Sequence, residues 1–173
     1  MKRHQSRTSG SAAQAVSCGH TTRVGVDLLE VSRIARLTDR DSGCRLVFSP
    51  AELRHADSLG PQRRLEHLAG RFCAKEAVAK ALGRGLGQGL TWPEIEVLAD
   101  RSAEPLVVLS GGAALVAEKA GVVRVSLSIS HQAGLVFCVA VAEIHQSAAG
   151  RPRRRVVPRG RAVRALRALS RRI

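Results

Sequence analysis

The sequence predicts an α+β domain in which helices come first and a small, mainly antiparallel sheet follows. Up to about residue 82 the apolar residues recur at helical spacing, whereas from Pro93 onward they alternate or form short runs typical of strands. Aromatic residues make up only 2% of the chain, so Val, Leu, Ile and Ala must build the core. A length of 173 residues suits a single domain that buries a substantial core.

The charge of the chain is concentrated at its two ends. Three of the 28 Lys and Arg residues lie in residues 1–22 and ten lie in residues 146–173, and neither segment contains an acidic residue. The segment between them carries 15 basic and all 14 acidic residues, so it is nearly neutral although the formal net charge is +14. We expect a disordered leader at 1–22, a domain at 23–145 and a disordered Arg-rich tail at 146–173. This distribution gives little support to a folded surface that reads a specific nucleic acid.

The cysteines and the apolar runs indicate a cytoplasmic protein. The four cysteines have no paired spacing of the kind that holds zinc, so we expect reduced thiols. The longest apolar run, residues 135–142, is too short to cross a bilayer, and the N-terminus lacks the apolar stretch of a secretory signal. We therefore expect no transmembrane segment.

The first expected elements are a strand and a helix joined at Asp27. Residues 24–27 form a short apolar run that ends on this carboxylate, and helical periodicity begins near Leu28. The expected helix carries a basic flank formed by Arg33, Arg36 and Arg40. By itself, Asp27 is explained as the N-cap of this helix.

Two more helices are expected before residue 83. Ser49 is a suitable N-cap, Pro50 suits the first helical position and Glu52 completes a capping box, so a short helix should run from Pro50 to about Ser58. The longest helix should run from about Pro61 to Leu82 and end at Gly83. The glycine-rich residues 83–89 follow a helix instead of opening one, which favours a turn over a nucleotide-binding loop.

The expected strands lie in the second half of the chain. They cover residues 94–98, 106–109, 122–129 and 135–142, with a helix at about 111–120 between the second and the third. In the third strand, apolar residues alternate with Arg and Ser, so one face of the sheet should be buried. His131 follows this strand and, taken alone, is an ordinary turn residue.

Glu76 and Lys80 lie one turn apart on the longest expected helix and share a face. As an isolated pair they are an ordinary helical ion pair worth about 0.2–0.5 kcal/mol. Should the fold bring Asp27 beside Glu76, the two carboxylates would form a site for a hard cation. Without a cation, two carboxylates about 4 Å apart repel each other by roughly 4 kcal/mol at an effective dielectric constant of about 20.

Five segments, in the same order and spacing, resemble the holo-acyl-carrier-protein synthase family of phosphopantetheinyl transferases over about residues 24–143. Each segment is weak evidence alone, and the combination is specific. They are Gly25-Val26-Asp27 followed by Arg33; Phe48-Ser49-Pro50-Ala51-Glu52; Arg71-Phe72 with Lys75-Glu76-Ala77 and Lys80-Ala81; Glu94-Ile95-Glu96-Val97; and Ser128-Ile129-Ser130-His131. The resemblance implies the 4′-phosphopantetheinyl transferase fold.

The resemblance also implies a reaction. The 4′-phosphopantetheine group of coenzyme A passes to a serine of an apo acyl carrier protein, which gives the holo carrier and adenosine 3′,5′-bisphosphate. By this resemblance Asp27 and Glu76 hold Mg²⁺, and Lys80 acts on the departing phosphate. Arg71 and Lys75 are expected to contact phosphates of coenzyme A, and His131 is expected near the nucleotide. The general base is left open between Glu76 and a metal-bound water that Glu76 orients.

The partners implied by the resemblance are an acidic carrier and two further copies of the chain. Arg33, Arg36 and Arg40 would face the carrier, and a homotrimer would place active sites between protomers. Whether the carrier serves fatty-acid, polyketide or peptide synthesis stays open. The alternative function is binding of a nucleic acid or an anionic membrane through the Arg-rich tail. Deletion of residues 146–173 separates the two, since only the enzyme would keep its main activity.

Overall fold

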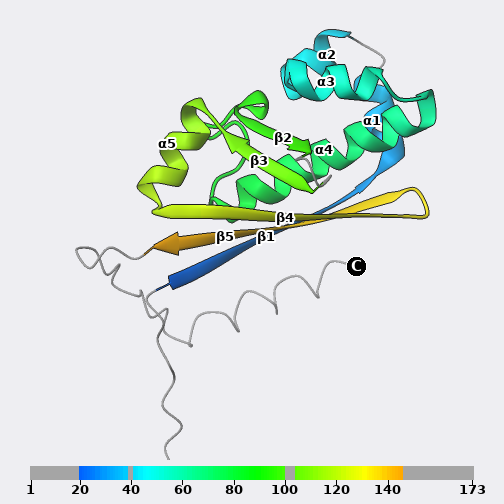
Figure 1. Ribbon diagram of the computed structural model, residues 1–173. Helices are drawn as coiled ribbons and strands as arrows, with labels where there is room; N and C mark the ends of the chain where they lie inside the picture. The colour runs from blue at the N-terminus through cyan, green and yellow to red at the C-terminus, as the bar shows by residue number, and fades with distance from the viewer. Residues whose placement is uncertain (1–19, 39–40, 100–103, 146–173) are drawn as a thin grey trace, which may run out of the picture.

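A computed structural model describes residues 20–38, 41–99 and 104–145. Its centre is a three-stranded antiparallel sheet with strand order β1 (His20–Glu30), β5 (Leu135–His145), β4 (Val122–Gln132), and helix α4 (Pro61–Ala81) lies across one face of it (Figure 1). This arrangement confirms the predicted α+β class. Most of the expected leader, all of the expected tail and Arg40 lie outside the described residues.

The register of the sheet decides which residues of β1 face α4. Asp27 pairs with Cys138, and Cys138 pairs with Ile129 on the other side. Gly25, Asp27 and Leu29 therefore share the face toward α4, whereas Val24, Val26 and Leu28 lie on the outer face and are exposed. The helix approaches so closely that a Cβ at Gly25 would overlap the carbonyl oxygen of Ala77.

The first strand is longer than predicted. It continues to Glu30 because Leu28 pairs with Phe137 and Glu30 pairs with Leu135, and helix α1 (Val31–Thr38) begins only then. The expected helix start near Leu28 is therefore wrong. Asp27 lies within the strand, so its interpretation as a helix N-cap is also wrong.

The helices before residue 83 follow the predictions with one addition. Helix α2 (Asp41–Val47) was not predicted, whereas α3 (Pro50–Asp57) has the expected capping box between Ser49 and Glu52. Helix α4 is followed by Gly83 at a φ of 76°, a conformation that glycine adopts readily, so the predicted end of the helix is confirmed.

The second half of the chain contains a small second sheet. A 3₁₀ turn η1 (Trp92–Glu94) leads into β2 (Ile95–Ala99), which pairs only with β3 (Pro105–Leu109) among the described strands, and helix α5 (Gly111–Lys119) follows. Strand β4 extends beyond its predicted end, so His131 lies in a strand and not in a turn.

The core lies between α4 and the sheet. Small residues on α4, among them Ala69, Ala74 and Ala77, are fully buried and allow the close approach to β1 and β5. Three cysteines among the described residues, Cys44, Cys73 and Cys138, are buried free thiols, as expected. In the described part of the chain, no helix combines the length and apolar character needed to cross a membrane.

Candidate active site

Strand β1 and helix α4 bring Asp27 and Lys80 together. The ammonium Nζ of Lys80 lies 2.7 Å from Oδ1 of Asp27 and donates a second hydrogen bond, 2.9 Å long, to the carbonyl oxygen of Val26. The Lys80 side chain is 48% exposed and that of Asp27 is 17% exposed. The ion pair of Lys80 thus forms with Asp27 and not with Glu76, its predicted partner along the helix. Because the ammonium is half exposed, it can leave this pair without being pulled out of a core.

Glu76 lies one turn before Lys80 on the same side of α4 and is partly buried. Burial is the largest cause that raises the pKa of the Glu76 carboxyl, and the charge of Asp27 raises it further, while Lys80 acts in the opposite direction. The two carboxylates therefore interact electrostatically across the contact between β1 and α4. The structure thus brings together Asp27, Glu76 and Lys80.

The donor set of this site suits a hard divalent cation. Two carboxylates supply only oxygen ligands, and Mg²⁺ characteristically takes one or two carboxylates and completes its shell with phosphate oxygens and water. The mutual repulsion that raises the pKa of Glu76 is the kind of repulsion that a bound cation relieves. Over residues 20–38, 41–99 and 104–145 no group of three or more His, Cys, Asp or Glu side chains gathers as a metal cage. The residues present therefore fit Mg²⁺ shared with a phosphate-bearing ligand.

Arg71 and His131 line a second region, an open cavity of about 990 Å³ bordered by β3, β4 and α5. Burial lowers the pKa of Arg71, and its Nε atom is buried without a hydrogen-bond partner in the part of the chain that the structure describes. His131 donates from Nε2 to the carbonyl oxygen of Glu66 over 3.2 Å, and its ring packs against Gly70. The cavity thus carries an imidazole and a guanidinium, groups that suit an anionic ligand.

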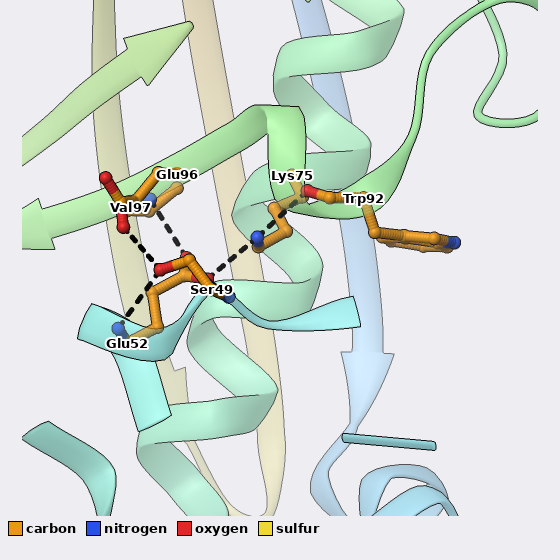
Figure 2. Close-up of polar contacts among 6 residues, drawn as sticks. All are labelled: Ser49, Glu52, Lys75, Trp92, Glu96 and Val97. Atoms are coloured by element: carbon orange, nitrogen blue, oxygen red, sulfur yellow. Dashed lines mark hydrogen bonds and ion pairs between the residues drawn. The ribbon is translucent and has the colours of Figure 1, made fainter. Parts of the chain in front are cut away.

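Lys75 lies apart from both regions. Its side chain is fully buried, and its ammonium lies 2.8 Å from Oε2 of Glu52 and donates to the carbonyl oxygen of Trp92 over 3.0 Å. Figure 2 shows this ammonium enclosed between the start of α3 and the segment that precedes β2. A phosphate has no access to a fully buried and already paired ammonium, so the geometry contradicts the expected contact between Lys75 and coenzyme A.

Two of the three predicted carrier-binding arginines, Arg33 and Arg36, lie on α1 and are exposed. The third, Arg40, lies outside the described residues. The exposure of Arg33 and Arg36 leaves their guanidinium groups on the surface, where a charged partner can reach them.

Sequence reasoning missed the contacts of two residues, one beside Asp27 and one that pairs with Lys75. The thiol of Cys73 donates to the carbonyl oxygen of Asp27 over 3.3 Å, and Glu52 neutralises Lys75. Glu52 had a recognisable signal, its position three residues after Ser49, but this signal predicts only a helix cap. No pattern in the sequence indicated the contact of Cys73.

Comparisons with known proteins show the family of the chain. The 4′-phosphopantetheinyl transferase superfamily matches residues 23–140. A holo-[acyl-carrier-protein] synthase of Clostridium acetobutylicum is 39% identical over 122 residues, which are 70% of this chain and 96% of that relative. One of Clavibacter sepedonicus is 44% identical over 121 residues, which are 69% of this chain and 93% of the relative. The solved complex of a Chronobacterium ammoniagenes synthase with coenzyme A superposes with a TM-score of 0.64 at 36% identity and covers 73% of this chain and 99% of that one.

Proposed function

Since this chain belongs to the 4′-phosphopantetheinyl transferase superfamily and is an enzyme of the holo-[acyl-carrier-protein] synthase type, we propose that it modifies an apo acyl carrier protein in a Mg²⁺-dependent reaction. The 4′-phosphopantetheine group of coenzyme A passes to a carrier serine, and adenosine 3′,5′-bisphosphate leaves. The observation that carries the proposal is the meeting of Asp27, Glu76 and Lys80 where α4 crosses β1. The coenzyme A complex of the Chronobacterium ammoniagenes relative supports the choice of donor.

Each of the three residues has a distinct part in the proposed reaction. Asp27 and Glu76 would hold Mg²⁺, which would neutralise charge on the pyrophosphate of coenzyme A. The serine Oγ forms a bond to the phosphorus that carries the pantetheine, and the bond from this phosphorus to the oxygen of the departing nucleotide breaks. Lys80 exchanges its contact with Asp27 for the departing phosphate and stabilises its negative charge.

The proton of the serine goes to Glu76, either directly or through one water. Without a cation, burial and the neighbouring Asp27 raise the pKa of Glu76, and bound Mg²⁺ would oppose this shift. The position of the Glu76 carboxylate beside Asp27 and Lys80 therefore supports its role as the base, and a raised pKa does not.

We assign the nucleotide portion of coenzyme A to the cavity that Arg71 and His131 line. The guanidinium of the half-buried Arg71 and the exposed imidazole of His131 both line the cavity and suit anionic groups, and the cavity volume of about 990 Å³ accommodates a nucleotide-sized ligand. Lys75 has no part in this assignment because its ammonium is enclosed.

The proposed assembly is a homotrimer with active sites between protomers. Its support is the outer face of the three-stranded sheet, where Val24, Val26, Leu28 and Phe137 are 59%, 43%, 59% and 43% exposed. A contiguous apolar sheet face of this kind is typical of a protein interface. Mass measurement in solution should give three chains per particle, and a monomer at micromolar concentration would contradict the assembly.

The proposed carrier is acidic and approaches the exposed Arg33 and Arg36 on α1. Because such steering acts between solvent-exposed charges, added salt should raise the KM for the carrier more than the KM for coenzyme A. The expected location of the reaction, the cytoplasm, stays a prediction.

The experiment is transfer to a panel of apo carriers from fatty-acid, polyketide and peptide synthesis. With coenzyme A and Mg²⁺, intact-mass spectrometry should show the addition of one phosphopantetheine to at least one carrier, and a chelator of divalent cations should abolish it. Absence of transfer to every member of the panel would refute the proposed function.

The Arg-rich tail is the basis of the second candidate function, binding to a nucleic acid or an anionic membrane. Ten arginines in residues 146–173 favour it. A variant that lacks these residues should keep its transferase rate. Loss of transfer together with loss of polyanion binding would favour the second candidate.

A further inference from the structure

A polar network surrounds Lys75 on α4 (Figure 2). The carboxylate of Glu52 accepts from Lys75 at 2.8 Å and from the backbone N–H of Ser49 at 2.8 Å, while its other oxygen accepts from the backbone N–H of Val97 at 2.9 Å. The hydroxyl of Ser49 donates to the carboxylate of Glu96. The network therefore links the start of α3, the middle of α4, η1 and β2.

The ion pair at the centre of the network is fully enclosed, and both of its charged groups have further partners. The side chains of Lys75 and Glu52 are both 0% exposed, and the ammonium also donates to the carbonyl oxygen of Trp92 at 3.0 Å and faces the ring of Phe48 at 6.0 Å. Burial of an ion pair adds little net stability, since desolvation of both charges opposes their attraction. Such a pair can instead select one arrangement of the elements it joins, because any other arrangement leaves a buried charge unpaired.

The position of Lys75 next to Glu76 in α4 connects the arrangement selected by the buried pair to the proposed active site. Consecutive residues of an α-helix are separated by about 100° around its axis, so a Lys75 side chain fixed in the network also fixes the direction of Glu76. Lys80 follows one turn later on the same side as Glu76. On the opposite side of the contact, Gly25 lets the backbone of α4 rest directly on β1.

We propose that Lys75 and Glu52 are positioning residues, whose buried pair sets the rotation and axial position of α4 so that Glu76 and Lys80 meet Asp27. The catalytic meaning of this inference rests on the proposed function, whereas its geometric part does not. On this proposal Lys75 holds the helix in position and does not contact the substrate.

The test compares a double variant with a matched control. Lys75→Met/Glu52→Gln removes both charges of the pair and keeps the approximate side-chain volumes. Glutamine has one acceptor oxygen, so the backbone N–H of Ser49 or of Val97 loses its partner, which costs less than the unpaired buried carboxylate that Lys75→Met alone would leave. Leu68→Val changes a fully buried residue of α4 outside the network and serves as a control for lowered stability. Three quantities are measured for each protein: cooperative thermal unfolding, kcat and KM for transfer to an apo carrier, and the amide resonance of Gly25.

The proposal predicts that the folded double variant loses kcat by roughly 10- to 100-fold, because a displacement of about 1 Å at a reacting group can cost about 10²-fold. The KM for coenzyme A should change less than about threefold if only positioning is lost. The Gly25 amide resonance should shift, since α4 packs directly on it. Leu68→Val should keep both the kcat and the Gly25 resonance of the wild type.

A double variant that unfolds cooperatively with wild-type kcat and an unmoved Gly25 resonance would overturn the proposal. Should the wild-type protein itself transfer nothing to any carrier, the proposed function fails, and the Gly25 resonance then decides the geometric part alone. In that case a shift in the double variant but not in Leu68→Val supports positioning, and an unmoved resonance overturns it.

Discussion

Helix α4 carries two lysine–carboxylate ion pairs of almost equal length in opposite surroundings. Lys75 lies 2.8 Å from Glu52 with both side chains 0% exposed, whereas Lys80 lies 2.7 Å from Asp27 with side chains 48% and 17% exposed. The buried pair has its hydrogen bonds completed by backbone groups of other elements. The exposed pair borders a third charge, Glu76, whose pKa is raised.

The difference in burial separates what each pair can do. A pair enclosed in protein cannot exchange partners without leaving a charge in a low-dielectric environment, so it holds a structure in place. A pair open to solvent can separate at little cost and release its ammonium to a phosphate. The chain thus places a fixed pair and an exchangeable pair five residues apart on one helix.

The largest expected effect is on stability when the buried pair is broken on one side. Lys75→Met leaves the Glu52 carboxylate buried without its cation and should lower the free energy of unfolding by about 3–5 kcal/mol. Denaturation by urea measures it, with Lys80→Met as the matched lysine control. A smaller loss for Lys75→Met than for Lys80→Met would contradict the contrast between the pairs.

The contact between α4 and β1 comes next. Gly25→Ala places a methyl group against the carbonyl oxygen of Ala77, so helix and strand must separate, at a cost typically about 1–3 kcal/mol. Both stability and transfer should fall, because Glu76 and Lys80 move away from Asp27. Gly85→Ala is the control, since a Cβ added at Gly85 would lie 3.5 Å from its nearest neighbour, an ordinary van der Waals contact. Equal behaviour of the two alanine variants would show that the approach at Gly25 is not needed.

Removal of the exposed lysine should have a small effect on stability. Lys80→Met should change the free energy of unfolding by no more than about 1 kcal/mol, because exposed ion pairs contribute about 0–1 kcal/mol. Its rate of transfer should nevertheless fall strongly, since the departing phosphate loses its cation. Urea denaturation and the intact-mass assay measure the two effects. A variant that keeps the transfer rate would remove Lys80 from the mechanism.

The effect expected to be smallest at neutral pH is a pH dependence near the buried pair, because it appears only as the pH falls below about 6.5. The rings of His55 and His67 lie 4.7 Å apart, and burial, followed by the charges of Arg71, His55 and His131, lowers the pKa of His67 from 6.5 to about 4. Between these values the unfolded chain binds a proton that the folded chain does not, so His67 should lower stability as the pH falls from 6.5 to about 4.

His67→Gln should weaken this dependence, which urea denaturation at several pH values will show. An identical pH profile for the wild type and the variant would exclude His67 as its source. Transfer rates should be compared only where both proteins stay folded.

The sequence predicted those parts of the fold and the site that depend on local patterns. The capping box of Ser49 and Glu52, the span of α4 and the shared face of Glu76 and Lys80 all follow from spacing along the chain. The extension of β1 beyond Asp27 was not predictable in this way, because residues 28–30 have helical spacing and join the sheet only through pairing with β5.

The role of Lys75 shows the same limit of prediction from local patterns. Its place beside Glu76 in a charged motif suggested contact with a phosphate, whereas its actual partners are Glu52, 23 positions earlier, and the backbone of Trp92, 17 positions later. Burial of a lysine depends on such distant contacts, which no local pattern reveals. Local patterns likewise could not show that Asp27 lies beside Glu76, because this contact depends on how β1 packs against α4.

The central claim is that α4 carries a buried pair that holds the structure and exposed groups that act in the reaction. Glu76→Gln tests it most directly when the transfer rate and the free energy of unfolding are measured on the same preparation. The rate should fall by about 10²–10³-fold, comparable to the loss of one electrostatic group at a reacting centre. Because burial and Asp27 raise the pKa of the Glu76 carboxyl, its ionised form opposes folding at neutral pH, so the variant should be at least as stable as the wild type. A retained transfer rate, or a loss of rate that merely follows a loss of folded protein, would contradict the account.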